Sequence, residues 1–158
     1  MSARQRNNRR WVVVDTNVAL VANGAQDDAS SACGNTCRQR LLDITRGRAG
    51  LVLDRGRRIE AEYGRKLRSS GQPGVGDAFL KWVLTNRANR QRCRQVGLTP
   101  RSDEPDDFTT FPNNPALADF DRDDRKFVAV ARAYGDETPV LQALDSKWWG
   151  LRDALARA

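Results

Sequence analysis

The chain has 158 residues, which is enough for one domain with a sizeable core and too few for two ordinary domains. Its 27 basic residues outnumber its 20 acidic ones, and all but four of the basic residues are arginine, whose guanidinium fork matches phosphate oxygens. The absence of histidine excludes Ser-His-Asp and Cys-His catalytic sites and imidazole-bound metals.

The three cysteines form no recognisable metal motif. Cys33 and Cys37 are four residues apart and Cys93 is distant from both, so a zinc site would lack a fourth soft ligand. We therefore expect reduced thiols in a cytoplasmic protein. No apolar run approaches the roughly 20 residues that a membrane span needs, so we expect no membrane partner.

The chain begins with a basic stretch. Residues 1–10 hold four arginines and no acid, which indicates either a solvated arm or an arm that touches phosphate. The folded domain is expected over 11–158. It opens with the β-rich run Trp11–Val14, a predicted buried strand that ends at Asp15. The spacing then predicts the start of a helix at Val18–Ala22.

Hydrophobic spacing and glycine or proline breaks predict the elements that follow. In chain order they are a loop over 24–35, a helix over 36–47, a strand over 50–53, a helix over 56–69, a long arginine-rich helix over 78–94, a surface loop over 101–117, a helix over 121–134, a strand over 139–144 and a helix over 146–156. Strands with continuous apolar runs that alternate with helices indicate a parallel sheet covered on both faces. We predict an α/β fold: a three-layer αβα sandwich with a central parallel sheet of four to five strands.

Two acids follow predicted strands. Asp15 ends the first strand and Asp145 ends the last, and the carboxyl ends of parallel strands meet at one edge of a sheet. A third acid, Asp124, extends the apolar stripe of the 121–134 helix at its N-terminal end. Asp121 is best explained as the cap of that helix.

The fourth acid is either Glu60 or Glu62, and the helical spacing does not choose between them. One of these glutamates, together with Asp15, Asp124 and Asp145, would make a group of four carboxylates in an otherwise basic protein. Ligands that are all oxygen select hard cations such as Mg²⁺ or Mn²⁺. Such a site can activate water for attack on a phosphodiester.

The motifs around these acids resemble PIN-domain nucleases over roughly residues 11–149. The resemblance is carried by Asp15-Thr16-Asn17-Val18, by Glu62-Tyr63, by the run from Asp121 to Phe127 with Ala129 and Ala131 after it, and by a late strand that ends in Asp145. It implies an αβα sandwich, Mg²⁺ or Mn²⁺ held by acids, and cleavage of RNA, often single-stranded. Many small bacterial members are VapC-type toxins that an antitoxin holds in check.

Carried over to this chain, the resemblance implies four catalytic metal ligands and four supporting residues. The ligands are Asp15, Glu62, Asp124 and Asp145, and the supporting residues are Thr16, Asn17, Asp121 and Asp123. The resemblance thus selects Glu62 over Glu60. Two positions depart from the family pattern: Ala143 stands where a Ser or Thr is usual, and Lys147 stands where many members carry another Asp.

A basic surface is expected in the 78–94 helix. Arg87, Arg90 and Arg94 are spaced three and four residues apart, so in a helix they would share a face. That face is either simply solvated or binds RNA.

These residues and the resemblance together predict a metal-dependent endoribonuclease. Such an enzyme could be the toxin of a toxin–antitoxin pair. The partners to be considered are a single-stranded RNA substrate, an antitoxin protein and a second copy of the chain. The alternative is a catalytically weak or inactive PIN-like module that binds nucleic acid and is regulated by a protein partner, with Ala143 as the sign of a decayed site.

Overall fold

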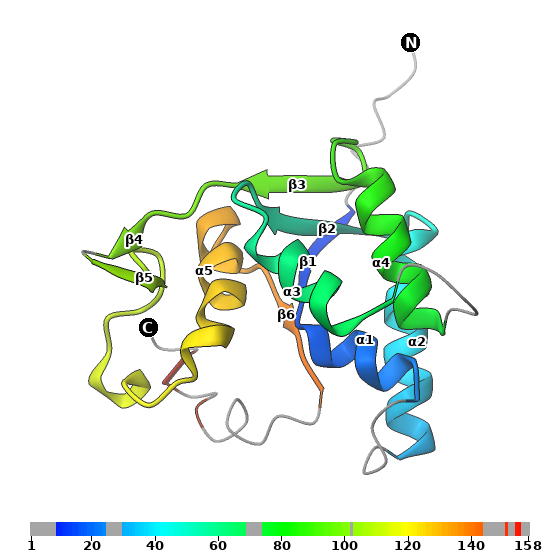
Figure 1. The fold of residues 1–158 in the computed structure, drawn as a ribbon, viewed down its shortest axis with the longest axis horizontal. Coiled ribbons are helices and arrows are strands. Elements are labelled where there is room, and N and C mark those ends of the chain that lie inside the picture. The colour runs from blue at the N-terminus through cyan, green and yellow to red at the C-terminus, as the bar shows by residue number, and fades with distance from the viewer. Residues whose placement is uncertain are drawn as a thin grey trace.

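A four-stranded parallel sheet forms the centre of the protein (Figure 1). A computed structural model describes residues 9–24, 30–68, 74–101, 103–143, 151 and 154–155. The strands are β1 (Arg10–Val14), β2 (Ala49–Asp54), β3 (Cys93–Val96) and β6 (Val140–Leu141), in the spatial order β3-β2-β1-β6. In the registers, Val12 pairs with Leu51, Leu51 with Cys93, and Val13 with Val140.

Five α-helices cover the sheet. They are α1 (Thr16–Ala22), α2 (Ser31–Thr45), α3 (Arg58–Lys66), α4 (Val75–Asn86) and α5 (Arg125–Tyr134). Because crossovers between parallel strands are right-handed, the helices between β1 and β3 lie on one face and α5 lies on the other. Figure 1 shows this division, and the contacts of α1 with α2 and α4, and of α5 with β1 and β2, agree with it. The predicted α/β fold with a parallel sheet is confirmed.

The core lies on both faces of β1 and β2. Val13, Val14 and the run Leu51–Leu53 are fully buried, as strands covered on both sides must be. Phe127 of α5 packs on one face of the sheet, and Leu41 of α2 belongs to the same continuous apolar cluster. No helix in the described ranges is long and apolar enough to cross a membrane.

The predicted helix over 78–94 is wrong in its second half. Helix α4 ends at Asn86, a turn follows in which the Asn89 side chain accepts a hydrogen bond from the backbone N–H of Gln91, and the chain then enters β3. Cys93 is buried against β2, so pairing with the sheet overrides the helical spacing of the arginines. As a result Arg87, Arg90 and Arg94 lie at a helix end, in a turn and on a strand, and they share no helix face.

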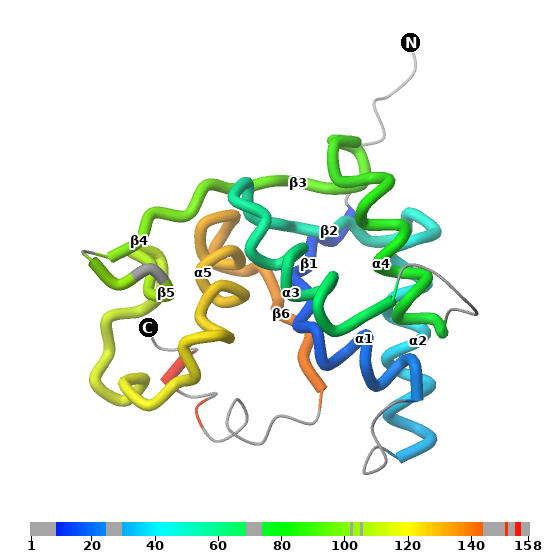
Figure 2. Tube along the Cα trace, in the orientation of Figure 1, coloured from blue at the N-terminus to red at the C-terminus, as the bar shows by residue number. Residues whose placement is uncertain are grey.

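The predicted surface loop over 101–117 is in fact partly regular and partly buried. It contains the antiparallel pair β4 (Pro100–Arg101) and β5 (Glu104–Phe108) and a 3-10 helix, η1 (Pro115–Leu117). Figure 2 shows the pair beside α5, and β5 contacts that helix. Three apolar side chains of this region join the core, namely Phe108, Phe111 and Leu117, as does Phe120 just after it.

Two helix predictions also need comment. Helix α2 begins at Ser31, earlier than the predicted 36, because the hydroxyl of Ser30 accepts a hydrogen bond from the N–H of Cys33 and caps the helix. The predicted helix over 146–156 lies mostly outside the described residues.

The close packing of α1 on α4 yields a stability prediction. A Cβ built on Gly76 would lie 2.1 Å from the backbone oxygen of Ala19, whereas one on Gly64 of α3 would meet nothing within 4 Å. Gly76→Ala should therefore lower the free energy of unfolding by about 2 kcal/mol. Gly64→Ala, the matched control, should raise it by roughly 0.5–1 kcal/mol, as expected when alanine replaces glycine in a helix. Urea unfolding of both variants checks this, and equal effects of the two changes would contradict it.

Candidate functional site

Asp15 lies at the carboxyl end of β1, where the sequence places it. Its backbone N–H donates to the carbonyl of Leu141 at 2.9 Å, which ties the start of α1 to the end of β6. Its side chain is buried, as is that of the next residue, Thr16. The Thr16 hydroxyl donates a hydrogen bond to the Glu62 carboxylate, so α1 and α3 meet at this edge of the sheet.

Glu62 is held from two sides. Besides the bond from Thr16, its other oxygen accepts a charge-assisted hydrogen bond of 2.8 Å from the Lys126 ammonium. The two side chains are only 3% and 10% exposed, so this ion pair is buried. Lys126 also donates to the backbone carbonyl of Asp123, which fixes the ammonium at the start of α5. Glu62 therefore joins α1, α3 and α5 at one point.

Tyr63, the residue after Glu62, is fully buried and reaches the end of β1. Its hydroxyl donates to the carbonyl of Val14, the last residue of β1. Burial, and then the negative charges of Asp15 and Glu62, raise the pKa of the Tyr63 phenol well above its usual value. The Tyr63 hydroxyl thus ties α3 to the end of β1, directly before Asp15.

Glu60 is also buried but lies in a different environment. Both of its carboxylate oxygens accept hydrogen bonds from Nε of Arg87, at 2.9 and 2.8 Å. It takes no part in the contacts that join Glu62 to Thr16 and Lys126. The spacing of the sequence left the choice between the two glutamates open, and in the fold it is Glu62, and not Glu60, that accepts the hydrogen bond from Thr16, the residue after Asp15. Arg87, one of the three arginines expected either to be solvated or to bind RNA, forms an ion pair with Glu60.

The acids before α5 have separate roles. Asp121 caps the 3-10 helix η2 (Arg122–Asp124) by accepting a hydrogen bond from the N–H of Asp123, so its predicted capping role is confirmed. Asp123 itself is exposed and contributes its backbone carbonyl to Lys126. Asp124 is half-buried at the junction of η2 and α5. Asn17 is half-buried in the first turn of α1.

The last predicted ligand, Asp145, lies outside the described residues, as does Lys147. Ala143, the position that departs from the PIN pattern, is buried. Within the described ranges no three His, Cys, Asp or Glu side chains are close enough together to hold a metal ion. Asp15 and Glu62, which the neighbouring Thr16 links, are buried carboxylates of the kind that Mg²⁺ and Mn²⁺ prefer. They fit a divalent cation in chemistry, and further ligands would have to complete the set.

A third acid at the carboxyl edge of the sheet was not predicted from the sequence. Asp54 ends β2 and is fully buried. It accepts hydrogen bonds of 3.0 Å from the backbone N–H groups of Arg58 and Ile59, and it forms an ion pair with the Arg58 side chain. It thus satisfies the first N–H groups of α3, because Arg57 at the N-cap position of that helix provides no side-chain acceptor. The rule that drew attention to Asp15, an acid directly after a buried strand, would have found it.

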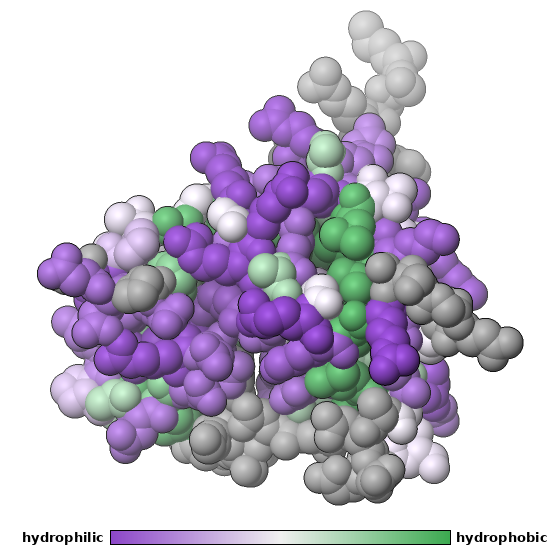
Figure 3. All heavy atoms as spheres, viewed as in Figure 1, coloured by the Kyte–Doolittle hydropathy of each residue, from purple (hydrophilic) through white to green (hydrophobic). Residues whose placement is uncertain are grey.

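A basic cleft opens beside the buried acids. It has a volume of about 390 Å³ and lies between the start of α3 and the segment from β5 to α5. Its lining residues are Gly56, Arg57, Arg58, Ala61, Arg65, Asp106, Phe108, Arg122, Asp123 and Lys126. Figure 3 shows that hydrophilic side chains cover most of this face of the protein. Lys126 lines the cleft and also contacts Glu62, so the cleft and the acid pair are adjacent.

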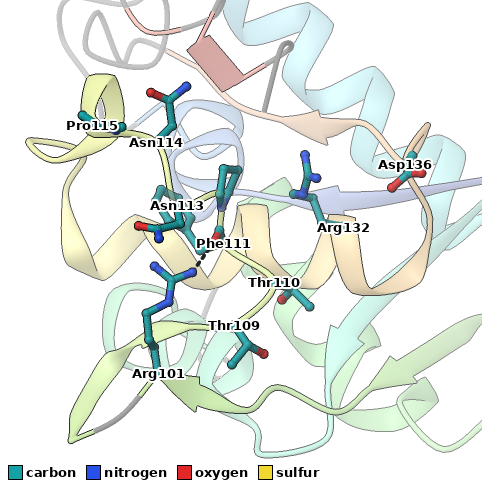
Figure 4. Close-up of a pocket in the computed structure, with 10 residues that line it drawn as sticks. Arg101, Thr109, Thr110, Phe111, Asn113, Asn114, Pro115, Arg132 and Asp136 are labelled. Carbon is teal, nitrogen blue, oxygen red and sulfur yellow. Dashed lines mark hydrogen bonds between the residues drawn. The ribbon is translucent and has the colours of Figure 1, made fainter.

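A larger hollow of about 580 Å³ lies beyond the β4–β5 pair (Figure 4). Arg101 is one of the cationic residues that line it. Its guanidinium donates to the carbonyls of Phe111 at 2.6 Å and Phe108 at 3.1 Å and pairs with Asp107. The guanidinium therefore holds the segment after β5 in place. The contacts of Arg101 account for its presence there without a ligand.

Comparison with known proteins adds no relative. No known protein family, curated protein or solved structure matches this chain.

The buried pair of Glu62 and Lys126 leads to a double-mutant prediction. Lys126→Met should lower the free energy of unfolding by about 3 kcal/mol, because it leaves a carboxylate buried without its cation. Adding Glu62→Gln to that variant should restore much of the loss. Urea unfolding of the two single variants and the double variant measures the coupling. Simple additivity of the two changes would contradict a direct buried interaction.

The thiol of Cys93 leads to a prediction about alkaline pH. Burial, and then the nearby negative charge of Glu60, raise the pKa of Cys93 from 9.0 to about 12. The folded protein keeps this thiol protonated where the unfolded chain ionises it, so stability should fall as the pH rises from about 9 towards 12, at up to ~1.4 kcal/mol per pH unit for this group. The fall should be shallower in Cys93→Ala. Urea unfolding at several pH values tests this, and equal slopes for both proteins would contradict it.

Proposed function

We propose that this protein is a divalent-metal-dependent endoribonuclease that hydrolyses RNA phosphodiester bonds, as its resemblance to PIN-domain nucleases implies. The observation that carries the proposal is the burial of Asp15, at the carboxyl end of β1, and of Glu62, which accepts a hydrogen bond from the next residue, Thr16, beside an arginine-lined cleft. Carboxylates are costly to bury, and a pair of them is typical of a site that binds a cation.

The roles of the residues follow from their contacts. Asp15 and Glu62 would hold the cation, with Asp124 and Asp145 as the remaining ligands that the resemblance implies. Thr16 orients Glu62 through its hydroxyl, and the resemblance implies a supporting role for Asn17. A bound divalent cation would supply the positive charge that acidifies water and offsets charge on the phosphodiester. The neighbouring arginines would hold the RNA backbone.

The biological setting is proposed on the resemblance alone. A cytoplasmic toxin that cleaves single-stranded RNA, and that an antitoxin protein holds in check, is the setting of many small PIN-domain nucleases. The excess of arginine over acid is consistent with such an RNA substrate.

A second candidate function is favoured by one observation. The ammonium of Lys126 already neutralises Glu62, at 2.8 Å, in a buried ion pair. Together with Ala143 at the departing position, this supports a PIN-like module that binds nucleic acid without cutting it. In such a module the lysine would replace the cation permanently, whereas in a nuclease metal binding would have to compete with it.

The cleavage assay compares labelled single-stranded RNA with DNA of the same sequence in the presence of Mg²⁺ or Mn²⁺. We expect cleavage of RNA by the wild type, and a loss of roughly 100-fold or more in Asp15→Asn, since even groups that only orient metal ligands are worth about 10–100-fold. Asp119→Asn, which changes an exposed acid outside the cleft, is the control and should retain activity.

Calorimetric titration with Mn²⁺ separates the two candidate functions. A nuclease should bind the ion, and Lys126→Met should bind it more tightly because the competing ammonium is gone. Intact RNA under every metal condition, together with no Mn²⁺ binding by either protein and RNA binding that survives Asp15→Asn, would replace the nuclease with the binding module.

A further inference from the structure

We propose that Gln142, the residue after β6, is a ligand of the divalent cation, which it holds together with Asp15 through its side-chain amide oxygen. The inference rests on the metal part of the proposed function, and it adds a neutral ligand to the acids that the sequence predicts. Neither the spacing of the sequence nor the resemblance to PIN-domain nucleases singles out this residue.

The side chain of Gln142 contains a buried polar atom without a partner. Its amide oxygen Oε1 is closed off from solvent and accepts no hydrogen bond from any residue that the structure describes. Gln95 of β3, by contrast, is a half-buried glutamine whose amide donates to the carbonyl of Arg87 at 2.9 Å. Because an unsatisfied buried acceptor lowers stability, the one on Gln142 needs an explanation, and a bound cation supplies one.

The register of the sheet places Gln142 opposite Asp15. Strand β6 pairs with β1 up to Leu141 opposite Val14, and the Asp15 N–H continues the ladder by donating to the Leu141 carbonyl at 2.9 Å. Asp15 is still in extended backbone, with φ of −66° and ψ of 142°. Residues at matching positions of paired strands project to the same face of a sheet. The next step of the register therefore brings the side chains of Asp15 and Gln142 to the same face, on neighbouring strands.

That face is the one that α5 covers. Trp11 projects to the same side of β1 as Asp15, and its ring centre lies 6.0 Å from that of Tyr134, the last residue of α5. Because α5 leads into β6, which is parallel to β1, the helix runs back against the strands. Ten residues of helix rise about 15 Å and four residues of strand about 13 Å. The first turn of α5, which holds Lys126, is therefore level with Asp15 and Gln142.

The chemistry of these side chains favours a hard cation. Asp15 is buried and acidic, and the Gln142 amide oxygen on the next strand is a neutral acceptor, so a ligand between them has to bring positive charge. Carbonyl and carboxylate oxygens together are the ligands that suit Mg²⁺ and Mn²⁺. Within the described part of the chain no three His, Cys, Asp or Glu side chains form a metal group. An amide oxygen supplies a ligand that the carboxylates do not, and the buried Ala143 has no polar side-chain atom to offer.

The test compares the full chain with Gln142→Leu, which keeps the approximate size of the side chain and removes the amide. Since the variant no longer buries an unsatisfied acceptor, its melting temperature in EDTA should equal that of the wild type or exceed it by up to about 4 °C. Calorimetric titration should nevertheless show Mn²⁺ binding weakened by roughly tenfold or more. Gln142→Glu, which offers a carboxylate oxygen at the same place, should bind Mn²⁺ at least as tightly as the wild type.

The matched control is Gln95→Leu, which removes a satisfied amide from β3, two strands away from β1. This variant should melt at a lower temperature than the wild type, because it loses the hydrogen bond to Arg87, and it should bind Mn²⁺ with unchanged affinity. The two glutamine variants are thus expected to have opposite effects: one changes metal binding without loss of stability, and the other changes stability alone.

The outcomes separate this ligand from the nuclease. Equal Mn²⁺ affinity of the wild type and Gln142→Leu overturns the role of Gln142 and leaves the nuclease in place. A clearly lower melting temperature of Gln142→Leu in EDTA also overturns it, since the amide then serves the fold. No Mn²⁺ binding by the wild type overturns both. Weaker Mn²⁺ binding by Gln142→Leu, with no cleavage of RNA by the wild type, supports the ligand and removes only the nuclease.

Discussion

Every buried carboxylate at the carboxyl edge of this sheet requires a compensating positive charge or hydrogen-bond donor, and those donors set how the helices are arranged. Asp54 uses the first N–H groups of α3, which fixes where that helix begins. Glu60 uses Arg87 and so holds the end of α4 against α3. Glu62 uses Thr16 and Lys126, which ties α1 and α5 to the same helix. Buried charge without such partners would cost several kcal/mol, so the acids help to place the helices alongside the apolar core.

The parts of the fold that were predictable from the sequence depend on local signals. Strands β1 and β2 have continuous apolar runs, and both end in an acid, so their burial and the position of Asp15 could be inferred without knowledge of the rest of the chain. The cap at Asp121 also follows from residues within one turn. These features need no distant partner.

The parts that were missed depend on contacts between distant residues. Strand β3 mixes Cys93 and Val96 with two polar residues, and only its pairing with β2 makes it a strand. The glutamates of α3 could not be told apart because their partners are far away in the sequence: Arg87 lies 27 residues after Glu60, and Thr16 lies 46 residues before Glu62. The burial of Phe108 and Phe111 likewise depends on α5, and nothing in the proline-rich segment around them predicts it.

The buried Lys126–Glu62 pair also offers a way to measure how often the contact between α3 and α5 opens. Lysine is scarce in this protein, with four residues in all, and of the three that the structure describes, Lys66 and Lys81 are exposed while Lys126 is buried. An amine-selective reagent would modify the exposed pair at once and reach Lys126 only when α5 separates from α3 or the ion pair opens. The acylation rate of this single amine, read by mass spectrometry, therefore reports how often the carboxyl edge of the sheet becomes accessible to anything from solution.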